Sequence, residues 1–387
     1  MSYQKEDEET LLQQESAPVV NSQPNKRAGY WLVTLVLALV SIVGLVSLSQ
    51  QKTVYNPFIK RTQLAKNKVI MYTSLSDSEK SDLFDEFKET FGKVYKSKSE
   101  EEEKFSNFKN FLKLVDKRNE KESKKDGTAT HGVTIFADLS EDEFKTYLGF
   151  KDSDESRKRR ILKSSKKVKV PKYTGDEDSV NWAGVYTTSV KDQGYCGSCW
   201  AFSASEQIES DSIRSGILTT SDSLSPQQIV SCDHYDYGCN GGNTESAYEY
   251  VQKAGGLETN AAYPYTSYFD SDGTCKAAEK KFKVTVDEYY TINGEDDMED
   301  YVKSTGPLSI CLAASSWSSY QSGVVSSCDK QVDHCVQVVG VNSKEGYWVV
   351  RNSWGTEWGE KGYIYLKTGE NMCDIDYDPT YTVPRAV

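Results

Sequence analysis

The chain has 387 residues, of which 37% are hydrophobic, 27% are charged and 12% are aromatic. This composition supplies enough apolar side chains for a sizeable core, and it excludes a wholly disordered chain or a collagen-like fibre. The formal net charge of −12 argues against a broad nucleic-acid-binding surface, because phosphate contacts need a basic face.

Charge and cysteine are distributed unevenly along the chain. Residues 1–169 contain 31 basic and 26 acidic residues, a net charge of +5, whereas residues 170–387 contain 15 and 32, a net charge of −17. All nine cysteines follow residue 195. Their odd number leaves at least one thiol beside any disulfides, so we expect the second half of the chain to fold in an oxidising compartment. The sequence therefore predicts an acidic, disulfide-bonded domain behind a basic segment.

A polar tail at residues 1–27 precedes an uncharged apolar stretch at residues 28–51. A helix over this stretch would be about 36 Å long, enough to cross a bilayer core of about 30 Å. We favour a retained transmembrane anchor over a cleaved signal peptide, because the apolar run exceeds an ordinary signal-peptide core. Basic residues flank the stretch on both sides and do not assign its orientation. The cysteines place the following domains outside the cytosol, as in a single-pass type II membrane protein.

Helical patterns follow a stem at residues 52–75. Apolar residues recur at helical spacing in LFDEFKETFGKVY and again in EEEKFSNFKNFLKLVDKRN, both within residues 76–150. Residues 151–170 are polar and basic, and we expect an exposed linker that is open to proteolysis. A nuclear localisation signal is a weaker interpretation of this linker, because an apolar stretch precedes it.

Residues 171–387 combine a helical stretch with later strand-like runs. The helical stretch follows Cys199, whereas GYWVVRNSW and GYIYL are rich in strand-forming residues and are bounded by glycine. A helix first and strands later indicate an α+β domain.

The segment QGYCGSCWAFS allows two interpretations of one cysteine pair. Cys196 and Cys199 form a C-x-x-C motif, which is typical of a redox pair or of half a zinc site. Alternatively, Cys199 is a nucleophile at the start of a helix, where the helix N-terminus lowers the pKa of a thiol. His334 and Asn352 follow about 130 to 150 residues later, in the order expected of a nucleophile, a base and an orienting amide.

Together with GCNGG, VDHCVQVVG and RNSWG, these segments make the chain resemble the papain-like cysteine peptidases of the cathepsin L and F type. The resemblance runs from about residue 76 to the C-terminus. It implies a two-lobed peptidase at residues 171–387, with a helical lobe and a β-barrel-like lobe, behind an inhibitory propeptide domain at residues 76–150. It also implies that the reaction uses neither a metal nor another cofactor. The redox and zinc interpretations explain neither His334 nor Asn352.

The resemblance assigns a role to each matching residue. Cys199 would attack the peptide carbonyl, His334 would act as general acid and base, and Asn352 would orient the imidazole. Trp354 would shield that hydrogen bond from water, and Gln193 would donate its side-chain amide to the oxyanion. The expected substrate-binding residues are Gly241, Gly242, Asn243, Thr244, Cys311, Cys335, Asp378 and Trp354.

The resemblance also pairs six cysteines, as Cys196–Cys239, Cys232–Cys275 and Cys328–Cys373. Cys311 and Cys335 remain, at the pocket for the second substrate residue before the cut. A fourth disulfide is possible, but we favour two free thiols, because a buried cysteine behaves as a small apolar residue. Asp378 would lie at the floor of the same pocket, where a carboxylate favours Arg or Lys in the substrate. A one-residue shift of its loop would instead leave Asp378 in solvent.

The combined interpretation is a cysteine endopeptidase made as a propeptide-inhibited, membrane-anchored zymogen. Its partners would be protein and peptide substrates, its own propeptide and a membrane, and we expect a monomer. It would act in an endomembrane lumen such as the lysosome or a related acidic vacuole, or outside the cell after processing. An endopeptidase is favoured over an exopeptidase because no inserted segment blocks one end of the cleft. The alternatives are a catalytically silent peptide-binding relative and a membrane-tethered adhesion module.

The uneven charge predicts activation by acid. Near neutral pH a basic linker faces an acidic peptidase domain, and protonation of carboxylates would weaken this attraction as the pH falls. Screening limits the effect for exposed charges, so unfolding of the propeptide could contribute more.

Overall fold

The computed structural model describes residues 71–125, 127–152 and 168–387. We call residues 71–152 the N-terminal region and residues 168–387 the C-terminal region. Among the described residues, no helix is both long and apolar enough to cross a membrane. The expected tail and anchor lie outside the described residues, as do most of the stem and of the basic linker.

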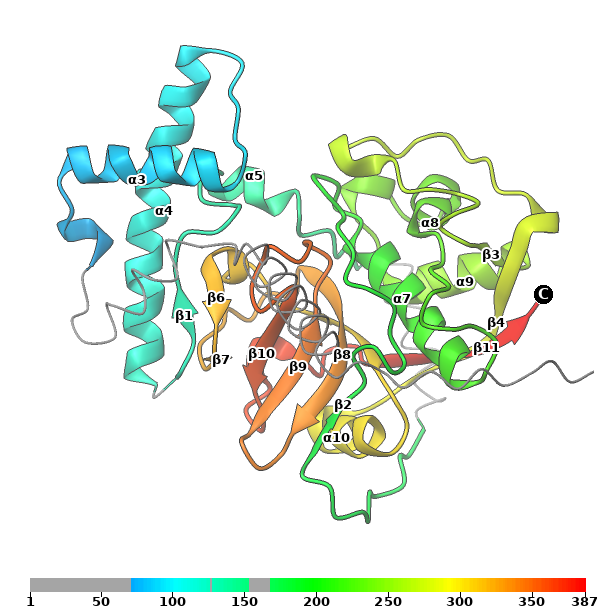
Figure 1. Cartoon of the computed structure of the whole chain (residues 1–387). Helices are drawn as coiled ribbons and strands as arrows, with labels where there is room; N and C mark the ends of the chain where they lie inside the picture. The colour runs from blue at the N-terminus through cyan, green and yellow to red at the C-terminus, as the bar shows by residue number, and fades with distance from the viewer. Residues whose placement is uncertain (1–70, 126, 153–167) are drawn as a thin grey trace, which may run out of the picture. The chain divides into compact units, whose positions relative to one another are not determined.

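The N-terminal region is built on two helices that share an aromatic core (Figure 1). Its elements are η1 (Tyr72–Ser74), α3 (Asp77–Thr90), α4 (Lys98–Lys124), β1 (Thr130–His131) and α5 (Glu141–Lys145). The predicted apolar faces are buried here, with Phe87 of α3 against Phe108 of α4. Ser76 caps α3 in a reciprocal pair with Glu79, which satisfies backbone N–H groups that the first turn leaves unpaired.

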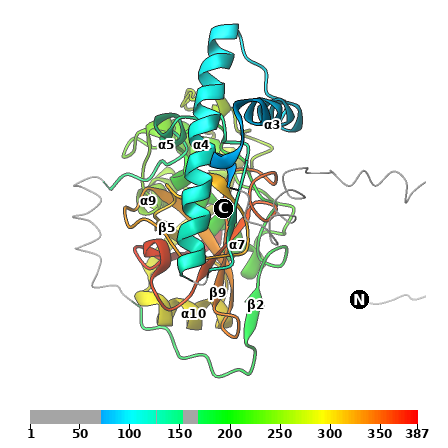
Figure 2. The ribbon, with the colours of Figure 1, turned by 90° about the vertical axis from the view of Figure 1, so that its left-hand side faces the viewer.

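The long helix α4 also holds the start of the described chain. Figure 2 shows α4 from the side, with α3 near one of its ends. The buried carboxylate of Asp116 accepts from the N–H groups of Tyr72 and Thr73, at 2.9 and 2.7 Å. These bonds fix η1 against the middle of α4.

The first half of the C-terminal region is mainly helical. Its elements are β2 (Ser179–Asn181), α7 (Cys199–Arg214), α8 (Pro226–Cys232), η3 (Gly238–Asn240), α9 (Thr244–Ala254), β3 (Leu257–Glu258), η4 (Ser267–Phe269) and η5 (Glu279–Lys281). Almost every residue of α7 is buried, because the helix packs on α8 and α9 and also on the strands β8 and β11. Cys199 therefore begins a helix that is covered on all sides.

The second half supplies most of the sheet. Its elements are β4 (Phe282–Thr291), α10 (Gly294–Ser304), β5 (Leu308–Leu312), η6 (Trp317–Ser319), β6 (Tyr320–Ser322), β7 (Val324–Val325), β8 (His334–Asn342), β9 (Tyr347–Arg351), β10 (Tyr363–Lys367), η7 (Met372–Asp374) and β11 (Thr380–Ala386). The strand order is β3-β4-β11-β5-β8-β9-β10-β7, with β2 paired to β8. Only β7 and β10 are parallel among these described pairs. The predicted α+β architecture is confirmed.

The two regions contact each other through a small sheet. β1 of the N-terminal region pairs antiparallel with β6, so that Thr130 faces Ser322 and His131 faces Tyr320. The side chain of Arg118 adds hydrogen bonds to Ser318 and Ser319 across the same boundary.

Four disulfides join eight of the nine cysteines, and Cys199 is the free thiol. Three of them are the pairs that the family resemblance implies, Cys196–Cys239, Cys232–Cys275 and Cys328–Cys373. The fourth joins Cys311 to Cys335, so the favoured expectation of two free thiols is wrong. The reason is strand register: these two residues lie directly opposite each other on β5 and β8, with their Cα atoms 4.0 Å apart.

Candidate active site

Cys199 is the first residue of α7, and its side chain is fully buried. Its Sγ accepts a hydrogen bond from the backbone N–H of Cys335 over 3.4 Å. Ser198 precedes the helix as its N-cap and makes no side-chain capping bond. The thiol thus lies at the N-terminus of a helix of 16 residues, where the helix dipole favours a thiolate.

His334 and Asn352 form a buried hydrogen-bonded pair on neighbouring strands. His334 begins β8, and Asn352 directly follows β9. The Nε2 of His334 lies 2.8 Å from the Oδ1 of Asn352 and, since a carbonyl oxygen only accepts, donates its proton there. The other ring nitrogen, Nδ1, has no hydrogen-bond partner among the described residues. The next residue, Cys335, is the one whose backbone N–H contacts the thiol.

Trp354 covers this pair. Its ring centroid lies 4.8 Å from that of His334, and its exposed fraction is 3%. Phe136 and Phe144 of the N-terminal region also pack edge-on against the indole, at 5.2 and 5.4 Å between centroids. Both regions therefore exclude water from the imidazole.

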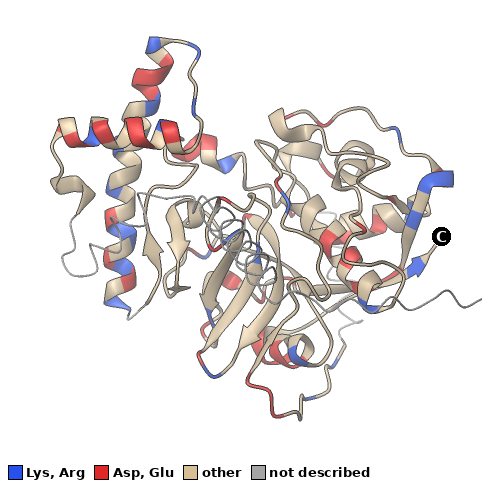
Figure 3. Ribbon diagram, viewed as in Figure 1, with Lys and Arg blue, Asp and Glu red and all other residues tan. Residues whose placement is uncertain are grey.

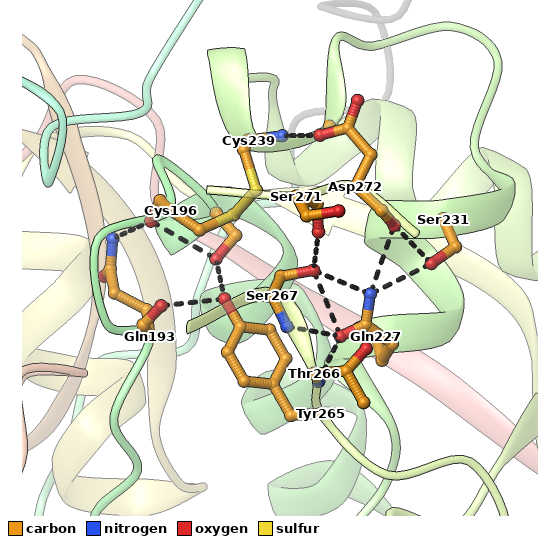
Figure 4. The surroundings of a disulfide bond; sticks show 12 residues. Gln193, Cys196, Gln227, Ser231, Cys239, Tyr265, Thr266, Ser267, Ser271 and Asp272 are labelled. Atoms are coloured by element: carbon orange, nitrogen blue, oxygen red, sulfur yellow. Dashed lines mark hydrogen bonds between the residues drawn. A yellow bond between two sulfur atoms is a disulfide. The ribbon is translucent and has the colours of Figure 1, made fainter. Parts of the chain in front are cut away.

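Gln193 is fully buried and held at each end of its amide. Its Oε1 accepts from the hydroxyl of Ser353 at 2.7 Å. Its Nε2 donates to the carbonyl of Cys196 at 2.8 Å and to the carbonyl of Tyr147 at 3.0 Å. Tyr265 donates its hydroxyl to the backbone carbonyl of Gln193, which Figure 4 shows beside the Cys196–Cys239 disulfide. The amide expected at the oxyanion thus binds a carbonyl of the N-terminal region.

The chain after Tyr147 is bound as an extended peptide beside the thiol. The N–H of Gly242 donates to Gly149, and the N–H of Lys151 donates back to Gly242, both at 2.9 Å. The N–H of Phe150 donates to the carbonyl of Asp333 at 2.9 Å. These bonds form a parallel bridge between Phe150 and Gly242, as when a peptide adds a strand to a protein edge.

Gly149 lies closest to the segment that carries the thiol. A β-carbon at this position would overlap the carbonyl of Gly197, whose own backbone is fixed by a bond to Cys239. Only glycine allows the strand to lie this deep.

Burial keeps the thiol and the imidazole neutral in this state. It raises the pKa of the Cys199 thiol to about 12, against the opposing effect of N–H groups from Cys335 and Gly149. It lowers the pKa of His334 to about 4, against the effect of its bond to Asn352. Between these values the thiol is protonated and the imidazole is not, so the site holds no nucleophile while it is covered.

The remaining predicted substrate-binding residues lie at the start of α9 and just before β11. Gly241 and Gly242 follow η3, and Gly242 makes the backbone bonds described above. Asn243 is the N-cap of α9, where its side chain accepts from a backbone N–H, and Thr244 is the first residue of that helix. Asp378 is fully buried, so its placement in solvent is excluded.

Sequence reasoning missed three features of this site. Ser353 fixes the Gln193 amide and lies inside the RNSWG motif, so the motif held the signal. Tyr147 and Gly149 contact the site directly but lie at the end of a weak helical pattern, where nothing in their spacing marks them.

Comparison with known proteins identifies the class. Residues 176–383 match the model of the papain family of cysteine proteases, and residues 84–144 match the cathepsin propeptide inhibitor domain (I29). Cysteine proteinase RD21A of Arabidopsis thaliana is 36% identical over 328 residues, which cover 80% of this chain and 67% of that protein. Cysteine proteinase B of Leishmania mexicana is 37% identical over 306 residues, which cover 77% and 68%. The solved structure of digestive procathepsin L2 from Tenebrio molitor larval midgut has a TM-score of 0.69 at 28% identity, covering 79% of this chain and 99% of that chain.

The chain belongs to the papain family of cysteine proteases. It carries the inhibitory propeptide of a zymogen in its N-terminal region, so the family expected from the sequence is confirmed.

We predict that Gly149→Ala weakens inhibition by the N-terminal region. The added methyl group overlaps the Gly197 carbonyl, and the strand must lift from the thiol. A cost of only about 1.4 kcal/mol corresponds to a tenfold rise in the uncovered fraction. The measurement is hydrolysis of a small fluorogenic peptide by the full chain at neutral pH. Thr146→Ala, which alters an exposed side chain nearby, is the control, and equal activity of both variants and the unchanged chain would contradict the prediction.

Proposed function

We propose that this protease is an endopeptidase with Cys199 as nucleophile and His334 as general acid and base, activated at acidic pH. The observation that carries the proposal is the strand Gly149–Lys151, which is hydrogen-bonded beside the thiol as an extended peptide. Its substrates are then proteins and peptides in extended conformation. We further propose that the propeptide domain spans residues 76–150 and the peptidase domain residues 171–387.

The path of the bound strand favours an endopeptidase. Tyr147 contacts Gln193, and four residues later Lys151 contacts Gly242. The bound chain therefore continues on both sides of Gly149, the residue next to the thiol segment. A substrate cut in its interior needs such a path.

The chemistry follows from uncovering the thiol. Departure of the strand returns Cys199 to water, which lowers the pKa of the thiol. Its position at the N-terminus of α7 favours the thiolate as well. The Nδ1 of His334 takes the thiol proton and returns it to the leaving amine, while Asn352 keeps the ring in place through Nε2. The thiolate forms a thioester with the substrate carbonyl, and water activated by His334 hydrolyses it.

The amide of Gln193 supplies the second component of the mechanism. It already donates to a carbonyl, that of Tyr147, and it is held rigidly by Ser353. A preorganised donor stabilises the oxyanion of the tetrahedral intermediate without reorganising during the reaction.

Asp378 supports a substrate preference within the same proposal. Burial raises the pKa of the neighbouring Tyr289 hydroxyl, and the charges of Glu245, Glu249 and Asp378 add to that effect. The acidic surroundings favour Arg or Lys at the subsite where the sequence places Asp378.

We predict that Gln193→Ala lowers kcat by about 10²- to 10³-fold with little change in KM, because the donor acts on the oxyanion rather than on bound substrate. Steady-state hydrolysis of a fluorogenic peptide by the matured enzyme measures both constants. Cys199→Ala should abolish turnover, and Gln252→Ala, on the exposed side of α9, is the control. Retained turnover in Cys199→Ala would overturn the assignment of the nucleophile.

Two titratable groups support acid activation at the boundary between the regions. The buried carboxylate of Glu122 on α4 accepts from the N–H and the hydroxyl of Ser326, at 2.9 and 2.6 Å. The Nδ1 of His131 lies 3.0 Å from the hydroxyl of Ser319, and its Nε2 lies 3.9 Å from Glu122. Arg118 is the nearby cation, and the ring of Tyr320 faces the imidazole edge-on.

Both groups weaken the contact as the pH falls. Burial, together with the charge of Arg118, lowers the pKa of His131 despite the opposing effect of Glu122. When the N-terminal region departs, His131 regains its ordinary pKa of about 6.5. Its contribution to the stability of the contact is therefore complete above that pH and is lost as the pH falls below it. Burial alone would raise the pKa of Glu122, but His131 and Ser326 hold it below its usual range. The contribution of Glu122 to the stability of the contact is lost as the pH falls further.

Exposed charge is a weaker source of pH dependence. Acidic residues are prominent on α10, and both signs alternate along α4 (Figure 3). The basic linker that would face the acidic region lies largely outside the described residues. The buried pair of His131 and Glu122 therefore gives the more specific explanation of acid activation, since exposed ion pairs are screened by salt. An acidic lumen or an acidified extracellular space is then the proposed place of action.

We predict that His131→Gln moves the onset of processing to lower pH, by on the order of one unit, because glutamine can still bond to Ser319 but does not titrate. Gel analysis of the full chain after incubation at graded pH locates the onset. The matched control is His234→Gln, which removes an exposed histidine. An unchanged onset in His131→Gln, or equal shifts in both variants, would show that His131 does not sense the pH.

A further inference from the structure

The disulfide Cys311–Cys335 lies at the end of the strand pair that carries His334. β5 and β8 pair from Leu308 opposite Val338 to Leu312 opposite His334. His334 is thus the first residue of β8 and belongs to the last pair of the ladder. The pair beside it is Cys311 with Cys335, and it is covalently joined.

The end of a ladder is where strands separate most readily. Residues 313–333 form a long connection between β5 and β8, and the disulfide closes it with a sequence separation of 24. A covalent bond at the penultimate pair prevents the final pair from opening. The start of β8 is also held by the N–H of Asp333, which donates to the carbonyl of Leu312 at 3.0 Å, and by the hydrogen bond of His334 to Asn352.

Cys335 also contacts the predicted nucleophile, Cys199. The backbone N–H of Cys335 donates to the Sγ of Cys199, and both residues lie in one buried cluster with Cys311. A donor aimed at sulfur favours the charged form of a thiol. The Cys311–Cys335 disulfide therefore lies next to His334, the proposed base, and includes the residue whose N–H contacts the Cys199 sulfur.

Strands β5 and β8 are also joined to α7, through hydroxyl groups. Ser203, one turn after Cys199, donates to the carbonyl of Val336 at 2.7 Å and shares a hydrogen bond of 2.8 Å with Ser309 of β5. The helix that carries the thiol is therefore fixed to the same two strands that the disulfide joins.

We propose that Cys311–Cys335 is a positioning disulfide that holds the start of β8, so that the Cys335 N–H stays aimed at the Cys199 sulfur and His334 stays in place beside Asn352. The inference rests on the proposed function of Cys199 and His334. It assigns the disulfide an effect on the reaction beyond its effect on folding.

The test compares two double variants with the unchanged chain after acid maturation of the full-length protein. Cys311→Ala with Cys335→Ala removes the bond and leaves space, whereas Cys311→Val with Cys335→Val removes the bond and fills that space. The control, Cys232→Ala with Cys275→Ala, removes a disulfide that joins the end of α8 to residue 275, outside the β5–β8 pair. For each protein we would measure kcat, KM, the melting temperature, and the pH dependence of Cys199 alkylation by iodoacetamide.

Both variants at 311 and 335 should show kcat reduced on the order of tenfold with KM nearly unchanged. Their alkylation midpoint should rise by on the order of one pH unit, because a hydrogen bond to a charged sulfur is weakened. The control should melt at lower temperature and keep the unchanged midpoint. An unchanged midpoint in the valine variant would assign the effect to packing and overturn the proposal, and this variant decides the outcome if the alanine variant does not fold. If the protein without substitutions matures but shows no alkylation at Cys199, the proposed function is refuted instead.

Discussion

The strand Gly149–Lys151 is held beside the Cys199 thiol by backbone hydrogen bonds to Gly242 and Asp333. While it remains there, water is excluded, the thiol pKa is raised and the imidazole pKa is lowered. A covered site therefore contains a neutral pair, although all the groups of a cysteine peptidase are assembled. Inhibition in this account combines a steric barrier with a shift of two protonation equilibria, and a single movement of the chain reverses both.

Two consecutive residues of strand β8 contact groups of the candidate site. The side chain of His334 lies with Trp354, whereas Cys335 lies with Cys199 in the cluster around α7. The backbone N–H of Cys335 contacts the Sγ of Cys199, and the preceding residue, His334, is hydrogen-bonded to Asn352. Fixing the start of that strand is enough to fix both, which gives a reason for the covalent bond between β5 and β8 at this point.

Much of this arrangement could be predicted from the sequence, because local motifs carry it. Cys199 lies in a glycine-rich approach to a helix, and the apolar spacing of residues such as Phe87 and Phe108 is satisfied in the helical core. The sequence left open whether Cys311 and Cys335 are joined, since that bond depends on the register of two strands, β5 and β8. The role of Gly149 depends on a close approach to Gly197 that leaves no periodic pattern. His131 is similar, because its environment is created by docking against residues of the other region. The expected anchor at residues 28–51 lies outside the described chain and stays a prediction.

The central claim is that one thiol is chemically silent under the N-terminal region and reactive without it. The most direct measurement incubates the full chain with a thiol-directed epoxide at neutral and at acidic pH, followed by intact mass and peptide mapping. The account predicts one label, on Cys199, that forms at acidic pH together with loss of the N-terminal region and is nearly absent at neutral pH. Equal labelling of Cys199 at both pH values, or a label on another residue, would contradict it.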